Sequence, residues 1–173
     1  MLEPILRFPQ FYDEWEEKKM RELCTVNQGL QIAISQRFTQ DGENRYFYIT
    51  NEFLKDNSSV KYYIERPPKT AIATPDDILM TRTGNTGIVI TNVNGCFHNN
   101  FFRINFNKKE LDKYFLYYFL KQDRIRYKIL ALAGNSTIPD LNHKDFYSLK
   151  IKYPCKQEQH KIANLLCNVD KYI

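Results

Sequence analysis

The residues that most often carry chemistry are dispersed along this chain. The histidines His98, His143 and His160 stand apart from one another, without HxH or HExxH spacing and without a paired cysteine. The segment TRTGNTG fits neither the GxGxxG dinucleotide pattern nor the P-loop pattern, and the sequence has no GxSxG nucleophile elbow. These patterns therefore indicate no nucleotide-dependent or nucleophilic enzyme.

Two kinds of segment are similar to parts of nucleic-acid enzymes, and both are incomplete. In ERPPK the Pro-Pro pair is flanked by Arg66 and Lys69, whereas an amino-methyltransferase needs an Asp or Asn before the prolines and a stacking ring after them. The Pro-Asp pairs at 75–76 and 139–140 could begin a metal-dependent nuclease site, but the acidic-x-Lys triplets lie far upstream, at 16–19. We expect no catalytic residue and no metal or cofactor site in this chain.

The chain suits a polyanionic partner better than a small substrate. Its formal net charge is +5 and its pI is about 8.9, which fits phosphate groups without a histone-like excess. Lys121, Arg124 and Lys128 are spaced i, i+3 and i+7, which on one helix gives a basic stripe. The alternative is an ordinary solvated helix flank.

Two polar loops offer further donors. In TRTGNTG, Arg82, Thr83 and Asn85 could reach a groove or a phosphate, although turn chemistry alone would explain the glycines and Asn85. The stretch GNSTIPDLNHKDF gathers polar side chains that either bind a partner or cap the two flanking elements. Both interpretations remain open for these polar residues: Asn135, Ser136, Thr137, Asn142, His143 and Lys144.

Strand patterns dominate the first two thirds of the chain. Trp15 to Leu23 reads as a short amphipathic helix, and alternation of Leu30, Ile32 and Ile34 predicts a strand within 26–35. RYFYITN, from 45 to 51, is rich in β-branched and aromatic residues. DDILMTR and IVITNV predict two strands joined by a tight turn at Gly84 and Gly87.

Helical periodicity dominates the last third. From Asn107, a capping residue, apolar side chains recur every three or four residues up to Leu132, and Gly134 suits the position after the helix. The strand-like SLKIKY precedes Pro154. The segment 155–173 then predicts a second helix, which either docks on its own domain or begins a coiled coil. One face of this second helix carries Ile162, Leu165, Leu166, Val169 and Ile173.

Size and cysteine usage limit the setting. At 173 residues we expect one domain with a terminal appendage, and 43% hydrophobic residues argue against disorder. The four cysteines have no CxxC spacing and are expected to be reduced core residues of a cytoplasmic protein. The N-terminus has no signal-peptide pattern and no run of about 18 apolar residues occurs, so neither secretion nor membrane insertion is expected.

Three stretches, in order, resemble the target recognition domain of a Type I restriction-modification specificity subunit. LRFPQFYDEWEEKKM resembles the opening W-E-x-x-x-L segment, with Met20 in place of Leu. DDILMTRTGNTGIVI resembles the D-I-L-x-x-R-x-G-x-x-G pattern. GNSTIPDL followed by EQHKIANLL resembles the G-S-T-I-P-x-L segment and the E-Q-x-x-I-A-x-x-L helix start, with Asn135 as an inserted departure. The resemblance covers nearly the whole chain.

The resemblance implies an α/β fold of the α+β mixed kind, with a twisted mixed β-sheet and flanking helices. It also implies a DNA target recognition domain at 1–154 and the start of a truncated spacer or dimerisation helix at 155–173. The function implied is sequence-specific reading of one half of a bipartite site in double-stranded DNA, without catalysis. Methyl transfer, with S-adenosylmethionine, and cleavage, with ATP and Mg²⁺, would belong to partner methyltransferase and restriction subunits.

Base readers and phosphate contacts can be proposed from side-chain type, because Arg or Lys pairs with guanine and Asn or Gln with adenine. Residues 36–66 match no pattern, and in this family such segments are where members read different bases. The base-reading candidates are Arg37, Arg45, Asn51, Lys61, Arg66, Arg82, Thr83 and Asn85. The phosphate candidates are Lys69, Lys121, Arg124, Lys128, Asn135, Ser136, Thr137 and Lys144.

The chain departs from the family in length, since a full specificity subunit resembles two such domains joined by long antiparallel helices. We therefore expect a half-subunit, a truncated product or an excised fragment, with a homodimer through the terminal helix as one arrangement. A second hypothesis from another class is a truncated decoy protein that binds restriction-modification subunits without reading DNA. A stand-alone nucleic-acid enzyme is disfavoured because its groupings of carboxylates and histidines are absent from the sequence.

Overall fold

Strands and helices are mixed along the chain, as the sequence predicts. The computed structural model of the protein describes residues 7–55, 60–134 and 137–172, so the predicted contact residues Asn135, Ser136 and Ile173 lie outside the described residues. The strands are β1 (Glu16–Lys19), β2 (Cys24–Gln28), β3 (Arg45–Ile49), β4 (Tyr63–Glu65), β5 (Ile72–Ala73), β6 (Ile78–Thr81), β7 (Val89–Thr91), β8 (Gly95–Phe97), β9 (Phe101–Phe106) and β10 (Lys150–Tyr153). The α-helices are α1 (Met20–Leu23), α2 (Lys113–Lys121), α3 (Asp123–Ala133), α4 (His143–Ser148) and α5 (Lys156–Val169), and the 3-10 helices are η1 (Ile34–Gln36), η2 (Asn51–Leu54) and η3 (Lys69–Ala71).

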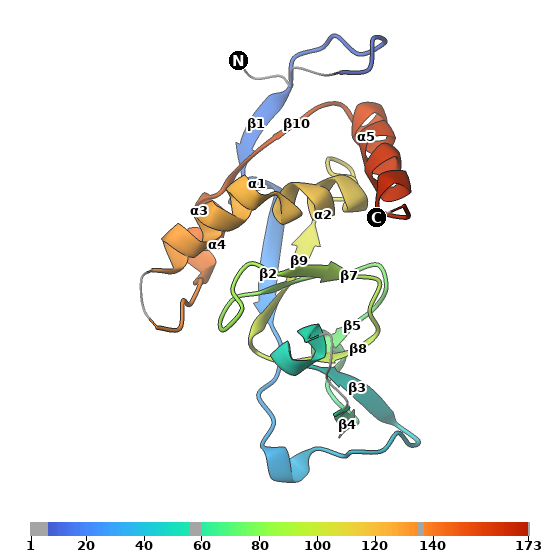
Figure 1. Cartoon of the computed structure of the whole chain (residues 1–173), viewed down its shortest axis with the longest axis vertical. Helices are drawn as coiled ribbons and strands as arrows, with labels where there is room; N and C mark the ends of the chain where they lie inside the picture. The colour runs from blue at the N-terminus through green and yellow to red at the C-terminus, as the bar shows by residue number, and fades with distance from the viewer. Residues whose placement is uncertain (1–6, 56–59, 135–136, 173) are drawn as a thin grey trace.

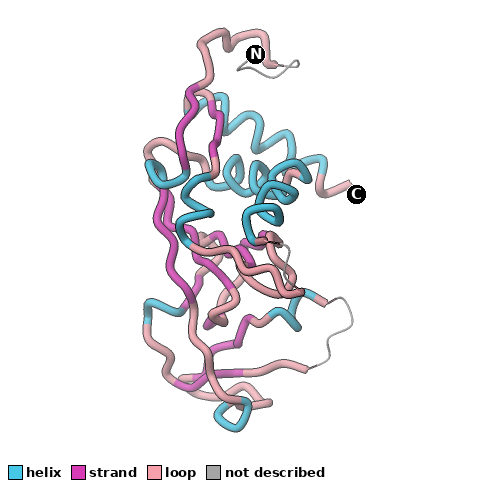
Figure 2. The backbone as a smooth tube through the Cα atoms, turned by 90° about the vertical axis from the view of Figure 1, so that its left-hand side faces the viewer, coloured by secondary structure: helices cyan, strands magenta, loops and turns pink. Residues whose placement is uncertain are grey.

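The molecule is elongated, with its α-helices towards one end (Figure 1). A central four-stranded antiparallel sheet has the order β2-β9-β6-β7. A second four-stranded sheet, β4-β3-β8-β5, lies towards the other end and is mixed because β3 and β8 run parallel. The end of the molecule that holds this sheet consists largely of loops (Figure 2). The mixed α/β class is thus confirmed, with the strands shared among three sheets.

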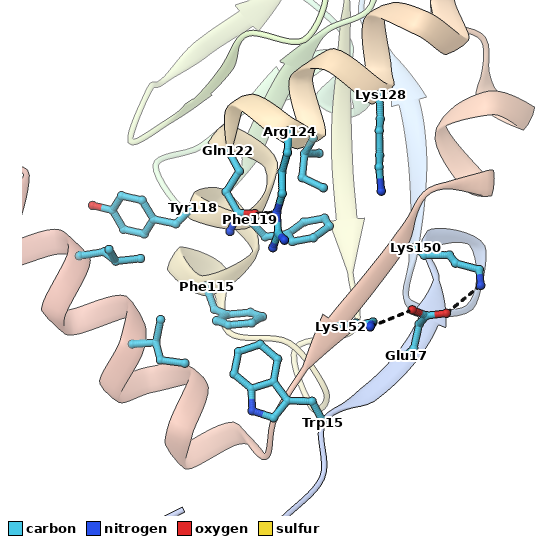
Figure 3. A pocket seen from close by; sticks show the side chains of 13 residues that line it. Trp15, Glu17, Phe115, Tyr118, Phe119, Gln122, Arg124, Lys128, Lys150 and Lys152 are labelled. Carbon is cyan, nitrogen blue, oxygen red and sulfur yellow. Dashed lines mark hydrogen bonds and ion pairs between the residues drawn. The ribbon is translucent and has the colours of Figure 1, made fainter. Parts of the chain in front are cut away.

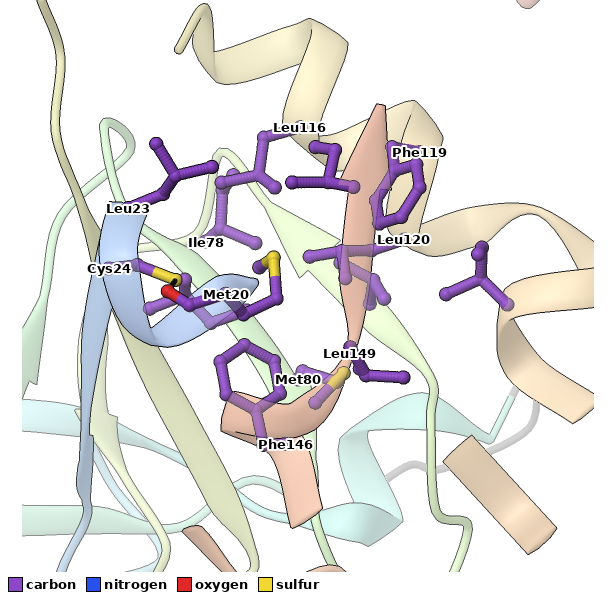
Figure 4. Packing of buried hydrophobic residues seen from close by; sticks show 14 of the residues in the cluster. Met20, Leu23, Cys24, Ile78, Met80, Leu116, Phe119, Leu120, Phe146 and Leu149 are labelled. Atoms are coloured by element: carbon purple, nitrogen blue, oxygen red, sulfur yellow. Dashed lines mark hydrogen bonds between the residues drawn. The ribbon is translucent and has the colours of Figure 1, made fainter. Parts of the chain in front are cut away.

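The main core lies between the central sheet and the helices. One fully buried cluster contains Met80 of the sheet, Leu116 and Leu120 of α2 and Phe146 of α4 (Figure 4). Phe102 of the sheet belongs to the same cluster. Alternation along β9 turns Phe102 to this core and Phe101 to a smaller cluster on the opposite face. The sheet is therefore covered on both faces and can hold its loops rigidly.

The first predicted helix is wrong over most of its length. Residues 16–19 form β1, which pairs antiparallel with β10, and helix follows only at Met20–Leu23. Cross-strand ion pairs stabilise this ladder, since Lys150 Nζ lies 2.7 Å and Lys152 Nζ 3.8 Å from the Glu17 carboxylate. Pairing with a strand more than 130 residues away overrides the local helical period.

The long helix predicted from Asn107 is two helices. Asp112, rather than Asn107, caps α2, because its Oδ1 accepts from the backbone N–H of Tyr114 and Phe115. Gln122, with ψ 134°, is extended and separates α2 from α3. The basic stripe predicted on one helix is therefore wrong, because Lys121 ends α2. Gly134 ends α3 with φ 87°, as predicted.

Other predictions hold in part. The strand predicted within 26–35 ends at Gln28, and residues 34–36 form η1. The strand predicted at 45–51 is β3, ending at Ile49, and the two strands joined at Gly84 and Gly87 are β6 and β7. Both glycines have positive φ, 80° and 86°. All four cysteines are free, but Cys155 is exposed and Cys167 is only half-buried, so the expected core position is confirmed for Cys24 and Cys96 alone.

The second predicted helix is confirmed as α5, and it is anchored at its start. Gln159 is buried, donates to the carbonyl oxygens of Glu110 and Pro154, and accepts from the Asp112 backbone N–H. Glu158 is also buried and pairs with Arg7 at 2.8 Å. The first turns of α5 therefore belong to the packed core, and its later residues extend away from them.

Candidate nucleic-acid interface

The turn between β6 and β7 is closed by its own side chains. The Thr81 hydroxyl donates to the carbonyl oxygen of Asn85, and the Thr86 hydroxyl donates to the Pro139 carbonyl oxygen over 2.7 Å. Thr81 and Thr86 are buried, whereas Asn85 at the tip is exposed. The turn is thus held rigidly by Thr81 and Thr86, and it exposes Asn85, which is one of the predicted base-reading residues.

The polar loop after α3 packs directly on this turn. Arg82 lies 2.7 Å from the Asp140 carboxylate, and its Nε donates to the Leu141 carbonyl oxygen over 3.3 Å. In the backbone, Leu141 N–H donates to the Arg82 carbonyl oxygen over 2.8 Å. Two polar loops separated by more than 50 residues therefore form one unit, the turn–loop cluster (residues 82–86 and 137–142).

The capping interpretation of the polar loop holds for Asn142. Its Oδ1 accepts from the backbone N–H of Asp145 over 2.9 Å, so Asn142 is the N-cap of α4. His143 packs its ring 4.8 Å from that of Phe102. Thr137 in the loop and Lys144 on α4 are both exposed, so each is accessible to a partner.

Asn51 joins the turn–loop cluster from a third part of the sequence. It begins η2, directly after β3, and its Nδ2 donates to the Thr83 carbonyl oxygen over 3.1 Å. The structure thus brings together Asn51, Arg82, Thr83 and Asn85, which the sequence offered only as scattered candidates. Of these, Asn85 is the most exposed, while Arg82 keeps 16% of its side chain accessible.

Four other base-reading candidates lie around the mixed sheet, towards the opposite end of the molecule. The Arg37 guanidinium donates twice to the Ile32 carbonyl oxygen, and Arg45 stacks 3.7 Å from the Phe38 ring centroid. These contacts hold both arginines against the protein. Lys61 and Arg66 are exposed, with 76% of the Arg66 side chain accessible. Lys69, a phosphate candidate, is exposed on η3.

The remaining phosphate candidates border a groove of about 540 Å³ at the helical end. Figure 3 shows Trp15 and Phe115 in this groove, with Arg124 and Lys128 projecting from α3. Sequence reasoning missed two further cations in this groove, Lys150 and Lys152 of β10. Their alternation with buried residues predicts a strand, but it does not indicate that this strand lies beside α3. Lys121 instead lies 3.8 Å from Asp170, after the end of α5.

The charges in the groove are unequal. Arg124, Lys128, Lys150 and Lys152 line it together with one carboxylate, Glu17. The hydrogen bond from Lys150 holds the pKa of Glu17 below its usual range, and the same contact raises the pKa of Lys150. The groove therefore keeps a positive rim above an aromatic floor.

The apolar face of α5 is only partly covered. Ile162 and Leu166 line the groove, whereas 54% of Leu165 and 45% of Val169 remain accessible. The four residues recur at helical spacing, and Leu165 and Val169, one turn apart, form an exposed stripe that suits contact with another helix. Sequence reasoning also missed an amide group beside Arg82, formed by Gln28, Gln31 and Asn99. The amide residues are visible in VNQGLQ and HNN, but no local pattern indicates that these two segments meet.

The described residues show no grouping typical of a metal site or a membrane span. Within residues 7–55, 60–134 and 137–172, three or more His, Cys, Asp or Glu side chains nowhere come together in a way that could hold a metal ion. In the same part of the chain, no helix has the length and apolar character needed to cross a membrane.

Comparison with known proteins decides the family. The model of the Type I restriction modification DNA specificity domain matches residues 12–173. The chain belongs to this family. The specificity domain is 26% identical over 170 residues to the Type I restriction enzyme MjaVIII specificity subunit of Methanocaldococcus jannaschii, covering 97% of this chain and 38% of that protein. It is 31% identical over 112 residues to the putative MjaX specificity subunit of the same organism, covering 64% of this chain and 25% of that protein.

Solved structures share the fold of this specificity domain. The S subunit of a Type I restriction-modification system from M. genitalium superposes with a TM-score of 0.67 at 24% identity, over 96% of this chain and 41% of that one. The HsdS subunit from Thermoanaerobacter tengcongensis gives a TM-score of 0.67 at 18% identity, over 98% and 40%. The chain therefore spans about two fifths of the length of these proteins.

The motifs by which the specificity domain resembles its family pack on one another. The D-I-L-x-x-R-x-G-x-x-G stretch forms β6 and the following turn, and its Arg82 binds Asp140 in the I-P-x-L part of the polar loop. The opening Trp15 and the helix-start residues Ile162 and Leu166 line the same groove. The family pattern thus describes a packed scaffold, on which the exposed polar side chains are carried.

Proposed function

We propose that this chain reads one half of a bipartite site in double-stranded DNA, as the recognition part of a Type I specificity subunit. The observation that carries the proposal is the family match over residues 12–173. The basic rim of the groove and the exposed donors on rigid loops support it, because phosphate contacts fix register while base-edge contacts carry sequence information.

The exposed candidates divide into two roles. Asn85 and, towards the other end, Lys61 and Arg66 offer donors to base edges, where each well-placed bidentate pair discriminates by about 1–3 kcal/mol. Arg124 and Lys128, with Lys69, Thr137 and Lys144, suit phosphate contacts. We assign DNA recognition to residues 1–154 and the start of a spacer helix to 155–173.

Catalysis belongs to other subunits in this proposal. A methyltransferase subunit would use S-adenosylmethionine, and a restriction subunit would use ATP and Mg²⁺, while the specificity domain directs both to the site. The chain itself contributes no catalytic residue and works in the cytoplasm. This division agrees with a sequence that lacks the patterns of methyltransferase and nuclease centres.

Selection from a pool of random duplexes tests the proposal directly. The chain is used alone and then with its cognate methyltransferase subunit, at two salt concentrations, because non-specific binding falls steeply with salt. Enrichment of a short motif that survives the higher salt is expected. Failure to enrich any motif under all four conditions would contradict DNA reading and favour a decoy that captures partner subunits.

We also propose that two copies associate through the exposed stripe of α5. Leu165 and Val169 are accessible, and burying them against a second helix would remove apolar surface from water. Sedimentation equilibrium should show a dimer that Leu165→Lys converts to monomer. Asn164→Lys, at the neighbouring exposed polar position, is the matched control and should leave the dimer intact. A wild-type chain that sediments as a monomer would rule out this arrangement.

A further inference from the structure

An amide-rich corner lies beside the turn–loop cluster. Gln28 ends β2, Gln31 follows it by three residues, and Asn99 lies in the turn between β8 and β9. Gln28 and Gln31 are exposed, and Asn99 is half-buried. Amide side chains can pair bidentately with adenine in the major groove, because they offer a donor and an acceptor side by side.

The backbone of this corner is held by hydrogen bonds to the sheets. Leu30 N–H donates to the Phe97 carbonyl oxygen over 2.9 Å, and Asn99 N–H donates to the Leu30 carbonyl oxygen over 3.0 Å. Arg82 N–H donates to the Asn100 carbonyl oxygen over 2.7 Å, which ties the corner to β6. Side chains carried here start from fixed positions, which lowers the entropic cost of ordering them on a ligand.

Packing around Gly29 fixes the path of the chain just before Gln31. A Cβ at Gly29 would lie 1.9 Å from the Phe97 carbonyl oxygen, so the backbone approaches β8 more closely than any side chain would permit. This approach sets where the chain leaves the central sheet. The position of Gln31 therefore follows from the sheet rather than from a free loop.

Asn99 orients the Gln31 amide. Asn99 Nδ2 donates to Gln31 Oε1 over 3.2 Å, which distinguishes the oxygen end of the glutamine from its nitrogen end. The Nε2 donor and the second lone pair of Oε1 are then available to a ligand. Adenine presents the matching pair in the major groove, an acceptor at N7 and a donor at N6.

The neighbouring Arg82 is already engaged within the chain. With the Gln28 amide oxygen turned towards it, Gln28 accepts from Arg82 Nε at 3.0 Å and Nη1 at 2.9 Å. Asp140 accepts from Arg82 Nη2 at 2.9 Å. The Gln31 side chain is more exposed than that of Arg82. A base edge can therefore reach Gln31 without breaking an ion pair within the chain.

We infer that Gln31, positioned by Asn99, contacts an adenine in the half-site that this chain reads. The inference rests on the proposed function and adds to it one base and the residue that recognises it. Asn99 acts through Gln31 as a positioning residue. Gln31 lies outside the 36–66 stretch and is not among the base-reading candidates that the sequence predicts.

Duplex selection with matched glutamine variants provides the first test. Wild type, Gln31→Ala and Gln36→Ala are compared, because Gln36 is an exposed glutamine on nearby η1. Gln31→Ala should weaken the preference for adenine at one motif position by about 5- to 150-fold and leave the other positions unchanged. Gln36→Ala should give the wild-type motif. Urea unfolding of each variant checks that the fold is retained.

A modified base separates direct contact from an indirect effect. Replacing the affected adenine by 7-deazaadenine removes the N7 acceptor, so wild-type binding should fall and Gln31→Ala binding should not fall further. Asn99→Ala should weaken the preference at the same position by a smaller factor. If 7-deazaadenine lowers the affinity of Gln31→Ala as much as it lowers that of wild type, the proposed contact is wrong.

The outcomes separate the inference from the function beneath it. If wild type enriches a motif and Gln31→Ala enriches the same motif with unchanged preferences, the adenine contact is wrong and DNA reading stands. If wild type enriches no motif, alone or with the methyltransferase subunit, both are wrong.

Discussion

At the scale of single residues, Arg82 joins two loops and is only slightly accessible. Arg82→Ala removes its ion pair with Asp140 and the bond to the Leu141 carbonyl oxygen, and it leaves that buried backbone acceptor without a donor. The free energy of unfolding should fall by about 1–3 kcal/mol, the usual cost of leaving a buried hydrogen-bonding group without a partner. Urea denaturation measures this change.

A comparison of two duplexes distinguishes this structural role from base reading by Arg82. If Arg82 only supports the loops, Asp140→Asn should also lower stability, and both variants should lose affinity for preferred and random duplex in similar proportion. A loss confined to the preferred duplex in Arg82→Ala, with unchanged stability, would instead establish Arg82 as a base reader.

His98 gives the fold a dependence on pH. Burial lowers its pKa, and the positive charge of Arg37 lowers it further, while a side-chain hydrogen bond with Asn100 opposes both effects. Because the unfolded chain then binds a proton more readily, stability is present above about pH 6.5 and is lost as the pH falls through the lowered pKa. Glu17 and Glu110, whose pKa values are also lowered, act at more acidic pH.

Equilibrium unfolding between pH 7 and 5 should therefore show a decline that His98→Gln reduces. His160→Gln, at an exposed histidine, is the control and should retain the full decline. If wild type and His98→Gln lose stability with pH in the same way, protonation of His98 does not contribute to the pH dependence of unfolding. The experiment is informative above about pH 5, where the carboxylates remain ionised.

At the scale of elements, local sequence patterns predict the strands and helices that are stabilised by interactions between residues close in sequence. The β6–β7 pair and α5 follow from alternation, glycine positions and apolar spacing, and these were recoverable from the sequence. Residues 16–19 were not, because their strand exists through pairing with β10, far along the chain. For the same reason no local pattern predicts that Gln31 and Asn99 meet, since their contact spans 68 residues of sequence.

The break between α2 and α3 leads to a test at this scale. Asp112 accepts from two N–H groups of the first turn of α2, so Asp112→Ala should lower the free energy of unfolding by about 1 kcal/mol. Asp123→Ala, at the start of α3, is the matched control because no side-chain hydrogen bond caps that helix. Thermal or urea unfolding compares the two, and equal losses would show that Asp112 does not act as a cap.

At the scale of the whole molecule, polar contacts are distributed over both ends. The mixed sheet carries Lys61 and Arg66, the turn–loop cluster carries Asn85, and the groove carries Arg124 and Lys128. A cationic side chain that contacts a DNA phosphate releases a counterion from the DNA on binding. Replacing such a side chain therefore reduces the dependence of affinity on salt, which shows which of these regions contacts phosphate. The groove is the region where several cations converge on one surface, which makes it the first to examine.

Arg124→Ala should reduce the slope of log K against log salt by about 0.9, the value for one phosphate contact on duplex DNA, while the enriched motif stays the same. Lys128→Ala should act alike. Arg21→Ala, at an exposed arginine on α1 that does not line the groove, is the matched control and should leave the slope unchanged. If Arg124→Ala and Lys128→Ala both leave the slope at its wild-type value, the groove does not face DNA, and its positive rim with an apolar floor would instead suit an acidic segment of a partner protein.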